Sequence, residues 1–215
     1  METSKILKTF SKHLLIPYAM ILGLNIILII LSLLINPFYD APYLCISINT
    51  IFSFLIGYII YGSYGRSFAL IQNNKKNFIM SSFIFIIANS ILLTLLVFLI
   101  LLIGFNKTIS ILSIIIIFLL FIGSTYLASL YGLLFKNKKI RKLFFMIIAL
   151  GLCIVFIGFL DTQINGFLDY LLTNSNNTKD FVKYLLLLGI PSITLCVICN
   201  FLYSYLNIAK VYSHE

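Results

Sequence analysis

Residues 109–135 read ISILSIIIIFLLFIGSTYLASLYGLLF, a run without a single charged side chain, and residues 136–142 follow it as KNKKIRK. A helix rises about 1.5 Å per residue, so roughly 20 apolar residues cross the hydrocarbon core of a bilayer. The first stretch is therefore long enough to span a membrane. The second places five positive charges where that helix would leave the bilayer. Together they predict a membrane protein built from helices.

The composition of the whole chain agrees with this prediction. Its 215 residues are 61% apolar and 10% charged, with a mean hydropathy of +1.11. Soluble domains are about half apolar and about a quarter charged. The net charge of +9 would suggest nucleic acid in a soluble protein, but here Lys and Arg lie in short hydrophilic gaps that suit anionic headgroups. We therefore expect membrane lipids as partners, and no nucleic acid.

Six stretches are long and apolar enough to be membrane spans. They are Leu14–Ile35, Tyr43–Tyr61, Phe78–Gly104, Ile109–Phe135, Leu143–Leu160 and Tyr184–Leu206. The gaps between them are too short for a second folded unit, so we expect one transmembrane domain over residues 14–210 and a cytoplasmic tail at 211–215. The predicted fold class is an all-α integral membrane protein with six transmembrane helices.

The positive charges predict the orientation, because cytoplasmic loops of membrane proteins carry an excess of Lys and Arg. If the N-terminus is inside, 12 of these residues lie on the inner side and 3 on the outer side. The outer three are Lys107, Lys179 and Lys183. An even number of spans returns the chain to its starting side. We therefore expect both termini to be cytoplasmic.

The first 13 residues are predicted to form a cytoplasmic, interfacial amphipathic helix. One helical face would carry the apolar residues Ile6, Leu7 and Phe10. The other face would carry Lys5, Lys8 and Lys12. Such a helix lies in the membrane surface with its lysines at the headgroups. The alternative is a charged tail that only sets the topology.

Patterns that carry catalysis or metal binding are missing from the sequence. It contains no HExxH, no GxSxG and no Walker A sequence GxxxxGK[ST], and its two histidines, His13 and His214, lie at opposite ends of the chain. The CxxC at residues 196–199 lies within an apolar run, where cysteine acts as a small apolar residue. We expect no catalytic, cofactor-binding or metal-binding residues and no enzyme activity, with thiol redox chemistry as the less favoured alternative.

Ion-coupled transport is also disfavoured. None of the six carboxylates lies in the middle of a predicted span, whereas ion-coupled transporters place charged groups there. The polar residues of the spans are mainly amides and hydroxyls, including Asn25, Asn49, Asn89 and Asn200, which we expect to form hydrogen bonds between helices. Any transport would therefore need a partner that supplies energy.

Two groups of residues are candidates for contacts with other helices or subunits. The first group consists of small residues at helical spacing, which predict close approach of helix backbones. Its members are Ser53, Gly57, Ser124, Ala128 and Gly132. The inner stretch Gly62–Asn77 mixes basic and apolar side chains, which predicts a short helix that lies against a partner or against the membrane, rather than a free linker. Its candidate coupling residues are Arg66, Phe68, Leu70, Ile71, Lys75 and Lys76.

The order of these features resembles the permease subunits of the ABC-2 exporter family. In that family an inner interfacial helix precedes six spans, a cytoplasmic segment after the second span docks on the ATPase, and a hydrophobic re-entrant region lies between the last two spans. The corresponding places here are Glu2–His13, Gly62–Asn77 and Gly166–Leu172. The stretch RSFALIQNNKKNF at residues 66–78 is similar to the run that opens the third span in small Gram-positive members, with Asn-Asn-Lys in place of the more usual Gly-x-[ST]-Arg.

The resemblance implies a permease subunit in a bacterial plasma membrane. It implies a second permease subunit, of the same or a different chain, and separate ATP-binding subunits that supply energy. Small members of the family often export, or confer immunity to, amphipathic and antimicrobial peptides, including the phenol-soluble modulins. The expected cargo is such peptides or other hydrophobic molecules. The alternative is a non-transporting scaffold or immunity protein that acts through helix–helix contacts.

Overall fold

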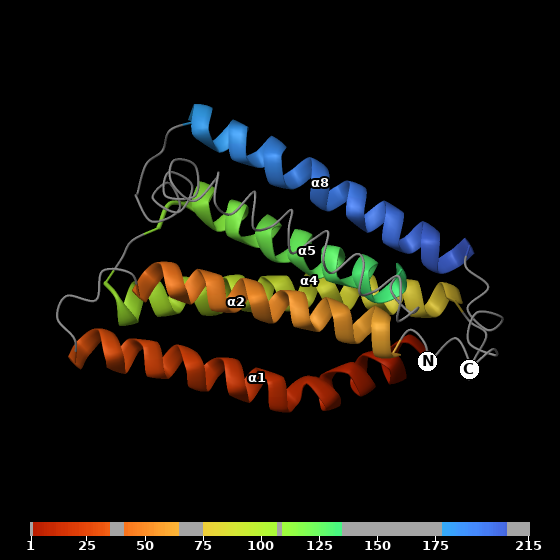
Figure 1. Cartoon of the computed structure of the whole chain (residues 1–215), viewed down its shortest axis with the longest axis horizontal. Helices are drawn as coiled ribbons and strands as arrows, with labels where there is room; N and C mark the ends of the chain where they lie inside the picture. Colours follow the sequence, from red (N-terminus) through yellow and green to blue (C-terminus); the bar gives the residue numbers. More distant parts are fainter. Residues whose placement is uncertain (1, 35–40, 65–74, 107–108, 135–177, 206–215) are drawn as a thin grey trace.

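The computed structural model describes residues 2–34, 41–64, 75–106, 109–134 and 178–205, and these ranges are helical almost throughout (Figure 1). The elements are α1 (Glu2–Leu34), α2 (Ala41–Gly57), the π-helix η1 (Tyr58–Tyr64), α4 (Lys75–Leu99), the π-helix η2 (Ile100–Gly104), α5 (Ile111–Leu134) and α8 (Thr178–Tyr205). No strand occurs in these ranges. The all-helical class predicted from the sequence is confirmed for this part of the chain.

Five helical segments are long and apolar enough to cross a membrane. They cover Leu14–Leu31, Leu44–Tyr61, Lys76–Gly104, Ile111–Leu133 and Thr178–Ser204. They coincide with five of the predicted spans and are consistent with a multi-pass membrane protein. The predicted span Leu143–Leu160, the stretch Gly166–Leu172 and most of the predicted docking stretch, residues 65–74, lie outside the described residues.

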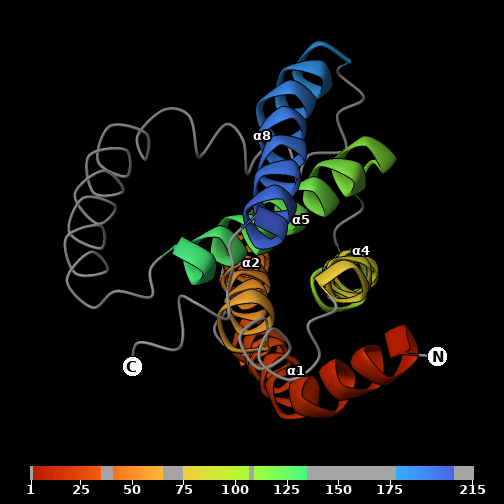
Figure 2. The same cartoon turned by 90° about the vertical axis from the view of Figure 1, so that its right-hand side faces the viewer.

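Residues 2–13, predicted to form an interfacial helix, and the first predicted span belong to one continuous helix, α1. Its backbone is helical from Glu2 to Leu34, and the stretch within it that is apolar enough to cross a membrane begins at Leu14. Pro17 lies inside this helix and cannot donate a backbone hydrogen bond, a common cause of helix bending. Figure 2 shows that α1 bends, with its N-terminal part turned away from the rest of the helix.

The helices run in two directions. α5 is parallel to α2, because Ser53 contacts Phe121 and Thr125 while Ser129, further along α5, contacts Gly57. α5 is also parallel to α8, since Leu119 bonds with Ser192 and Tyr126 with Cys199. Figure 2 shows α2, α5 and α8 following one another, with α4 beside them. α1 and α4 run the opposite way (Figure 1).

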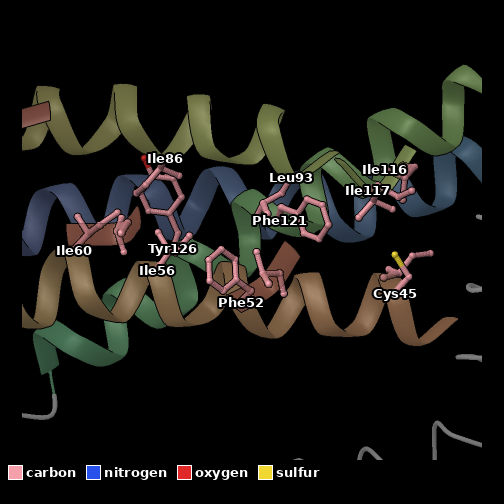
Figure 3. Packing of buried hydrophobic residues seen from close by; sticks show 14 of the residues in the cluster. Cys45, Phe52, Ile56, Ile60, Ile86, Leu93, Ile116, Ile117, Phe121 and Tyr126 are labelled. Atoms are coloured by element: carbon pink, nitrogen blue, oxygen red, sulfur yellow. The ribbon is translucent and has the colours of Figure 1, made fainter. Parts of the chain in front are cut away.

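The inside of the bundle combines large apolar side chains with polar ones. Figure 3 shows the apolar part, to which Phe52 and Ile56 of α2, Ile86 of α4 and Tyr126 of α5 contribute. Buried polar residues lie on α1, α2, α4, α5 and α8, and they include Asn25, Asn49, Ser53, Ser82, Asn89, Ser90, Thr125, Ser129 and Ser192. The outer surface instead exposes large apolar side chains such as Ile16, Ile103 and Phe201. This distribution suits a lipid environment, where polar groups must find partners within the protein.

Candidate functional site

The contact between α2 and α5 is built from small and hydroxyl-bearing residues. Ser53 Oγ donates a hydrogen bond to the carbonyl oxygen of Phe121 (2.7 Å) and lies 2.6 Å from the hydroxyl of Thr125. Ser124 Oγ donates to Ser53 Oγ at 3.1 Å, and Ser129 Oγ donates to the carbonyl oxygen of Gly57 at 3.2 Å. Each bond crosses between the two helices, which holds α2 and α5 in one register.

The predicted packing residues Ser53, Gly57 and Ser124 come together at this contact. Ala128 and Gly132 are buried further along α5. Thr125 and Ser129 complete the contact and were not among the predicted packing residues. Their spacing in the sequence carries a signal, since Thr125 and Ser129 are four residues apart and therefore share a helical face. That signal was masked by the stronger run of Ser124, Ala128 and Gly132.

α8 is held against α5 by side chains that bond to the α5 backbone. Ser192 Oγ lies 3.2 Å from the carbonyl oxygen of Leu119, and a Cβ added to Gly123 would lie 2.6 Å from that same Oγ atom. Cys199 Sγ donates to the carbonyl oxygen of Tyr126 at 3.2 Å. The second thiol of the CxxC, Cys196, accepts a hydrogen bond from Asn200 Nδ2 at 3.5 Å. Both thiols are free and both take part in packing contacts.

The four intramembrane asparagines all join one helix to another, which confirms their predicted role. Asn25 Oδ1 on α1 accepts from Asn49 Nδ2 on α2 at 3.1 Å. Asn89 on α4 accepts from the Tyr18 hydroxyl of α1, and Asn200 on α8 accepts from another tyrosine, in η1. Interhelical hydrogen bonds of this kind contribute about 0.6–2 kcal/mol each.

An aromatic cluster joins η1, the start of α4 and the end of α8. The ring of Tyr61 lies edge-on to Phe78 (5.5 Å between centroids) and to Tyr203 (5.7 Å), while Phe78 and Tyr203 stack at 4.6 Å. All three side chains are almost completely buried. The Tyr61 hydroxyl donates to Asn200 Oδ1 at 2.9 Å. Sequence reasoning missed this cluster, because aromatic residues near span ends are common at membrane interfaces and nothing in their spacing pairs three distant segments.

The predicted coupling residues lie next to this cluster or outside the described residues. Lys75 is the first residue of α4, and Lys76 has an exposed side chain. Arg66, Phe68, Leu70 and Ile71 are outside the described ranges. η1 ends at Tyr64 and α4 begins at Lys75, so both attachment points of residues 65–74 lie within a few residues of the aromatic cluster.

A groove of about 700 Å³ opens between the start of α4 and the end of α8, beside the aromatic cluster. Its lining is polar at Lys76, Asn77, Asn200 and Ser204 and apolar at Ile79, Met80 and Phe83. A second groove of about 390 Å³ lies between α1 and the continuous pair of α2 and η1. Its lining is apolar and includes Pro17 and Met20 of α1, Phe52 of α2 and Ile59 of η1. The first groove alone combines a cation, amides and a hydroxyl with an apolar wall.

Among the described residues, no three His, Cys, Asp or Glu side chains gather in a way that could hold a metal ion. No family model matches the chain, and no curated protein or solved structure matches it either.

Proposed function

We propose that this chain is the membrane-spanning permease subunit of an ATP-driven ABC-2 type exporter in a bacterial plasma membrane. It would pair with a second permease subunit, of the same or a different chain, and take energy from separate ATP-binding subunits. Its cargo would be amphipathic or antimicrobial peptides or other hydrophobic molecules. The observation that carries the proposal is the aromatic cluster of Tyr61, Phe78 and Tyr203, which links both attachment points of residues 65–74 to the last helix.

This link offers a route for mechanical coupling. A partner that docks on residues 65–74 would pull or push on Tyr61 and Phe78 together. Tyr203 contacts both rings, so the displacement would pass to α8. Aromatic pairs of this type contribute about 0.5–1.5 kcal/mol beyond their buried area. From α8 the movement would reach α5 through the contact of Ser192 with the carbonyl oxygen of Leu119.

The directions of the helices support six spans with both termini inside. α5 ends at one end of the bundle and α8 begins at the opposite end, the arrangement that an intervening span at Leu143–Leu160 requires (Figure 1). The start of α1 and the end of α8 lie at the same end. Lys75 and Lys76 belong to that end, which the excess of positive charge assigns to the cytoplasm.

A non-transporting scaffold or immunity protein is the second candidate. α8 exposes a row of large apolar side chains, including Leu186, Ile190, Ile193 and Val197. Such a surface suits helix–helix contacts with another membrane protein. Copurification separates the two candidates, because an ATP-binding protein that is retained on the tagged chain favours the exporter.

Two double variants test the exporter proposal, one that removes apolar side chains from the docking stretch and one that removes positive charges. Phe68→Ala combined with Ile71→Ala removes two apolar anchors, each worth roughly 1–3 kcal/mol in a partner's groove. We expect normal membrane insertion and expression. The amount of copurified ATP-binding protein and the rate of ATP-dependent export of a labelled amphipathic peptide should both fall at least tenfold. The matched control is Lys75→Gln with Lys76→Gln, which should reduce both much less.

Three results would count against the proposal. Full export by the apolar double variant would show that residues 65–74 have no docking role. A greater loss with the lysine pair than with the apolar pair would indicate that charge, rather than apolar contact, provides the coupling. Absence of any ATP-binding protein from the wild-type preparation would favour the scaffold.

A further inference from the structure

The groove between α4 and α8 carries a positive charge that the described side chains do not balance. Lys76 is exposed at its rim and forms no ion pair within the described part of the chain. Asp180 is the only carboxylate whose side chain the structure describes, and it lies in the first turn of α8. Ser204, which lines the groove, is near the other end of α8. Lys76 and Asp180 are therefore at opposite ends of the bundle.

One polar side chain of the groove, that of Asn200, can donate a hydrogen bond to an anion. Asn200 Oδ1 is occupied by the Tyr61 hydroxyl, which fixes the orientation of its amide. One amide N–H of Asn200 points to Cys196 Sγ, so the second N–H remains as a donor. Asn77 and Ser204 also line the groove, and the Ser204 hydroxyl donates to the carbonyl oxygen of Phe201 at 2.7 Å. Together with the ammonium of Lys76 they form one polar end of the groove.

The rest of the groove is apolar. Ile79, Met80 and Phe83 continue along α4 from the polar end, and Met80 is 55% exposed. A ligand that fits this lining needs a compact anionic group and an attached hydrocarbon chain. A free anion would leave the apolar wall uncovered, and a neutral lipid would leave Lys76 without a counter-charge.

We propose that this groove binds one anionic phospholipid, with its phosphate at Lys76 and one acyl chain along Met80 and Phe83. The choice of occupant follows from charge complementarity and from the position of the groove at the lysine-bearing end, where anionic headgroups attract juxtamembrane cations. The bound lipid bridges α4 and α8 beside the aromatic cluster and so stabilises the contact between these helices. This inference is independent of ATP and of transport.

The test uses the full chain purified in a neutral detergent. Native mass spectrometry should detect one bound phosphatidylglycerol, and added phosphatidylglycerol should raise the thermal unfolding temperature in a saturable way. Phosphatidylcholine with the same acyl chains, glycerol phosphate and inorganic phosphate should have little effect. Lys76→Gln should weaken phosphatidylglycerol binding about fivefold.

Two further variants make the test specific. Lys183→Gln removes the same charge at the opposite end of the bundle and should leave phosphatidylglycerol binding unchanged. Met80→Trp should obstruct the acyl-chain part of the groove and weaken binding without lowering the unfolding temperature of the lipid-free protein, because Met80 is exposed.

The proposal is overturned by any of three outcomes. Equal phosphatidylglycerol binding by Lys76→Gln and Lys183→Gln would show that no site exists at Lys76. Equal stabilisation by phosphatidylcholine would indicate a general lipid shell. Equal stabilisation by inorganic phosphate would indicate an anion site without a lipid.

Discussion

A Cβ atom added to Gly57 would lie 2.0 Å from the carbonyl oxygen of Thr125. The position of the Cβ is set by the Gly57 backbone and the oxygen is a backbone atom of Thr125, so neither atom can turn away as a flexible side chain would. The backbones of α2 and α5 are therefore in direct contact at this point. Close backbone approach at a small residue is a common way for helices to associate in lipid, where apolar surface alone gives no preference for protein over solvent.

Gly57→Ala should force α2 and α5 apart and break the neighbouring hydrogen bonds of Ser53 and Ser129. We expect the free energy of unfolding to fall by about 1–3 kcal/mol, which would be seen as a lower unfolding temperature or as reduced accumulation in the membrane. The chain has no Trp, so a thiol-reactive fluorogenic dye that reports exposure of buried Cys45 and Cys199 is a suitable probe. Gly23→Ala is the control, because nothing lies within 4 Å of its added Cβ. Equal unfolding temperatures for the two variants would contradict this packing.

Two fully buried serines should respond differently to the same substitution. Ser53→Ala removes a hydroxyl that contacts Phe121 and Thr125, so it should cost about 1 kcal/mol or more. Ser90 Oγ has no partner among the described residues, so Ser90→Ala should leave the stability unchanged or raise it. Thermal unfolding of both variants in one detergent checks the difference. A larger loss for Ser90→Ala would mean that Ser90 has a partner.

Tyr203→Leu should separate docking from transmission in the proposed exporter. The substitution keeps an apolar side chain but removes the ring that stacks on Phe78 at 4.6 Å. We expect the ATP-binding partner to copurify normally, because residues 65–74 are unchanged, while ATP-dependent export falls severalfold. Normal export by this variant would exclude the aromatic cluster as the coupling route.

The orientation can be measured with single cysteines in a background that lacks the native ones. Asn106→Cys and Lys179→Cys should react with a membrane-impermeant maleimide in intact cells, because both positions are assigned to the outer side. Lys76→Cys should react only after lysis. Labelling of Lys76→Cys in intact cells would reverse the topology, and with it the assignment of the lysine-bearing end to the cytoplasm.

The CxxC should be dispensable for function. Cys196 and Cys199 contact Asn200 and the Tyr126 backbone, which are packing contacts. Replacement of both cysteines by Ala should lower the unfolding temperature slightly and leave export near normal. Loss of export at normal expression would instead support thiol chemistry at this site.

Much of the fold could be predicted because membrane insertion depends on properties of each segment alone. The span predicted at Phe78–Gly104 agrees with α4 and η2 at Lys75–Gly104, and the span at Ile109–Phe135 agrees with α5 at Ile111–Leu134. Residues 2–13 continue into the first span as one helix, and Pro17 is accommodated within α1.

The sequence by itself determined the helical class, the positions of five apolar helices and the bonding role of the four intramembrane asparagines. Transfer of a segment into lipid depends on its own length, polarity and flanking charge. Only the tertiary structure decided which helices are neighbours. The contact of Gly57 with Thr125, the aromatic cluster and the groove at Lys76 each join residues far apart in the chain. The lipid around the helices is as apolar as their side chains, so hydropathy cannot select these neighbours, and backbone fit and hydrogen bonding do.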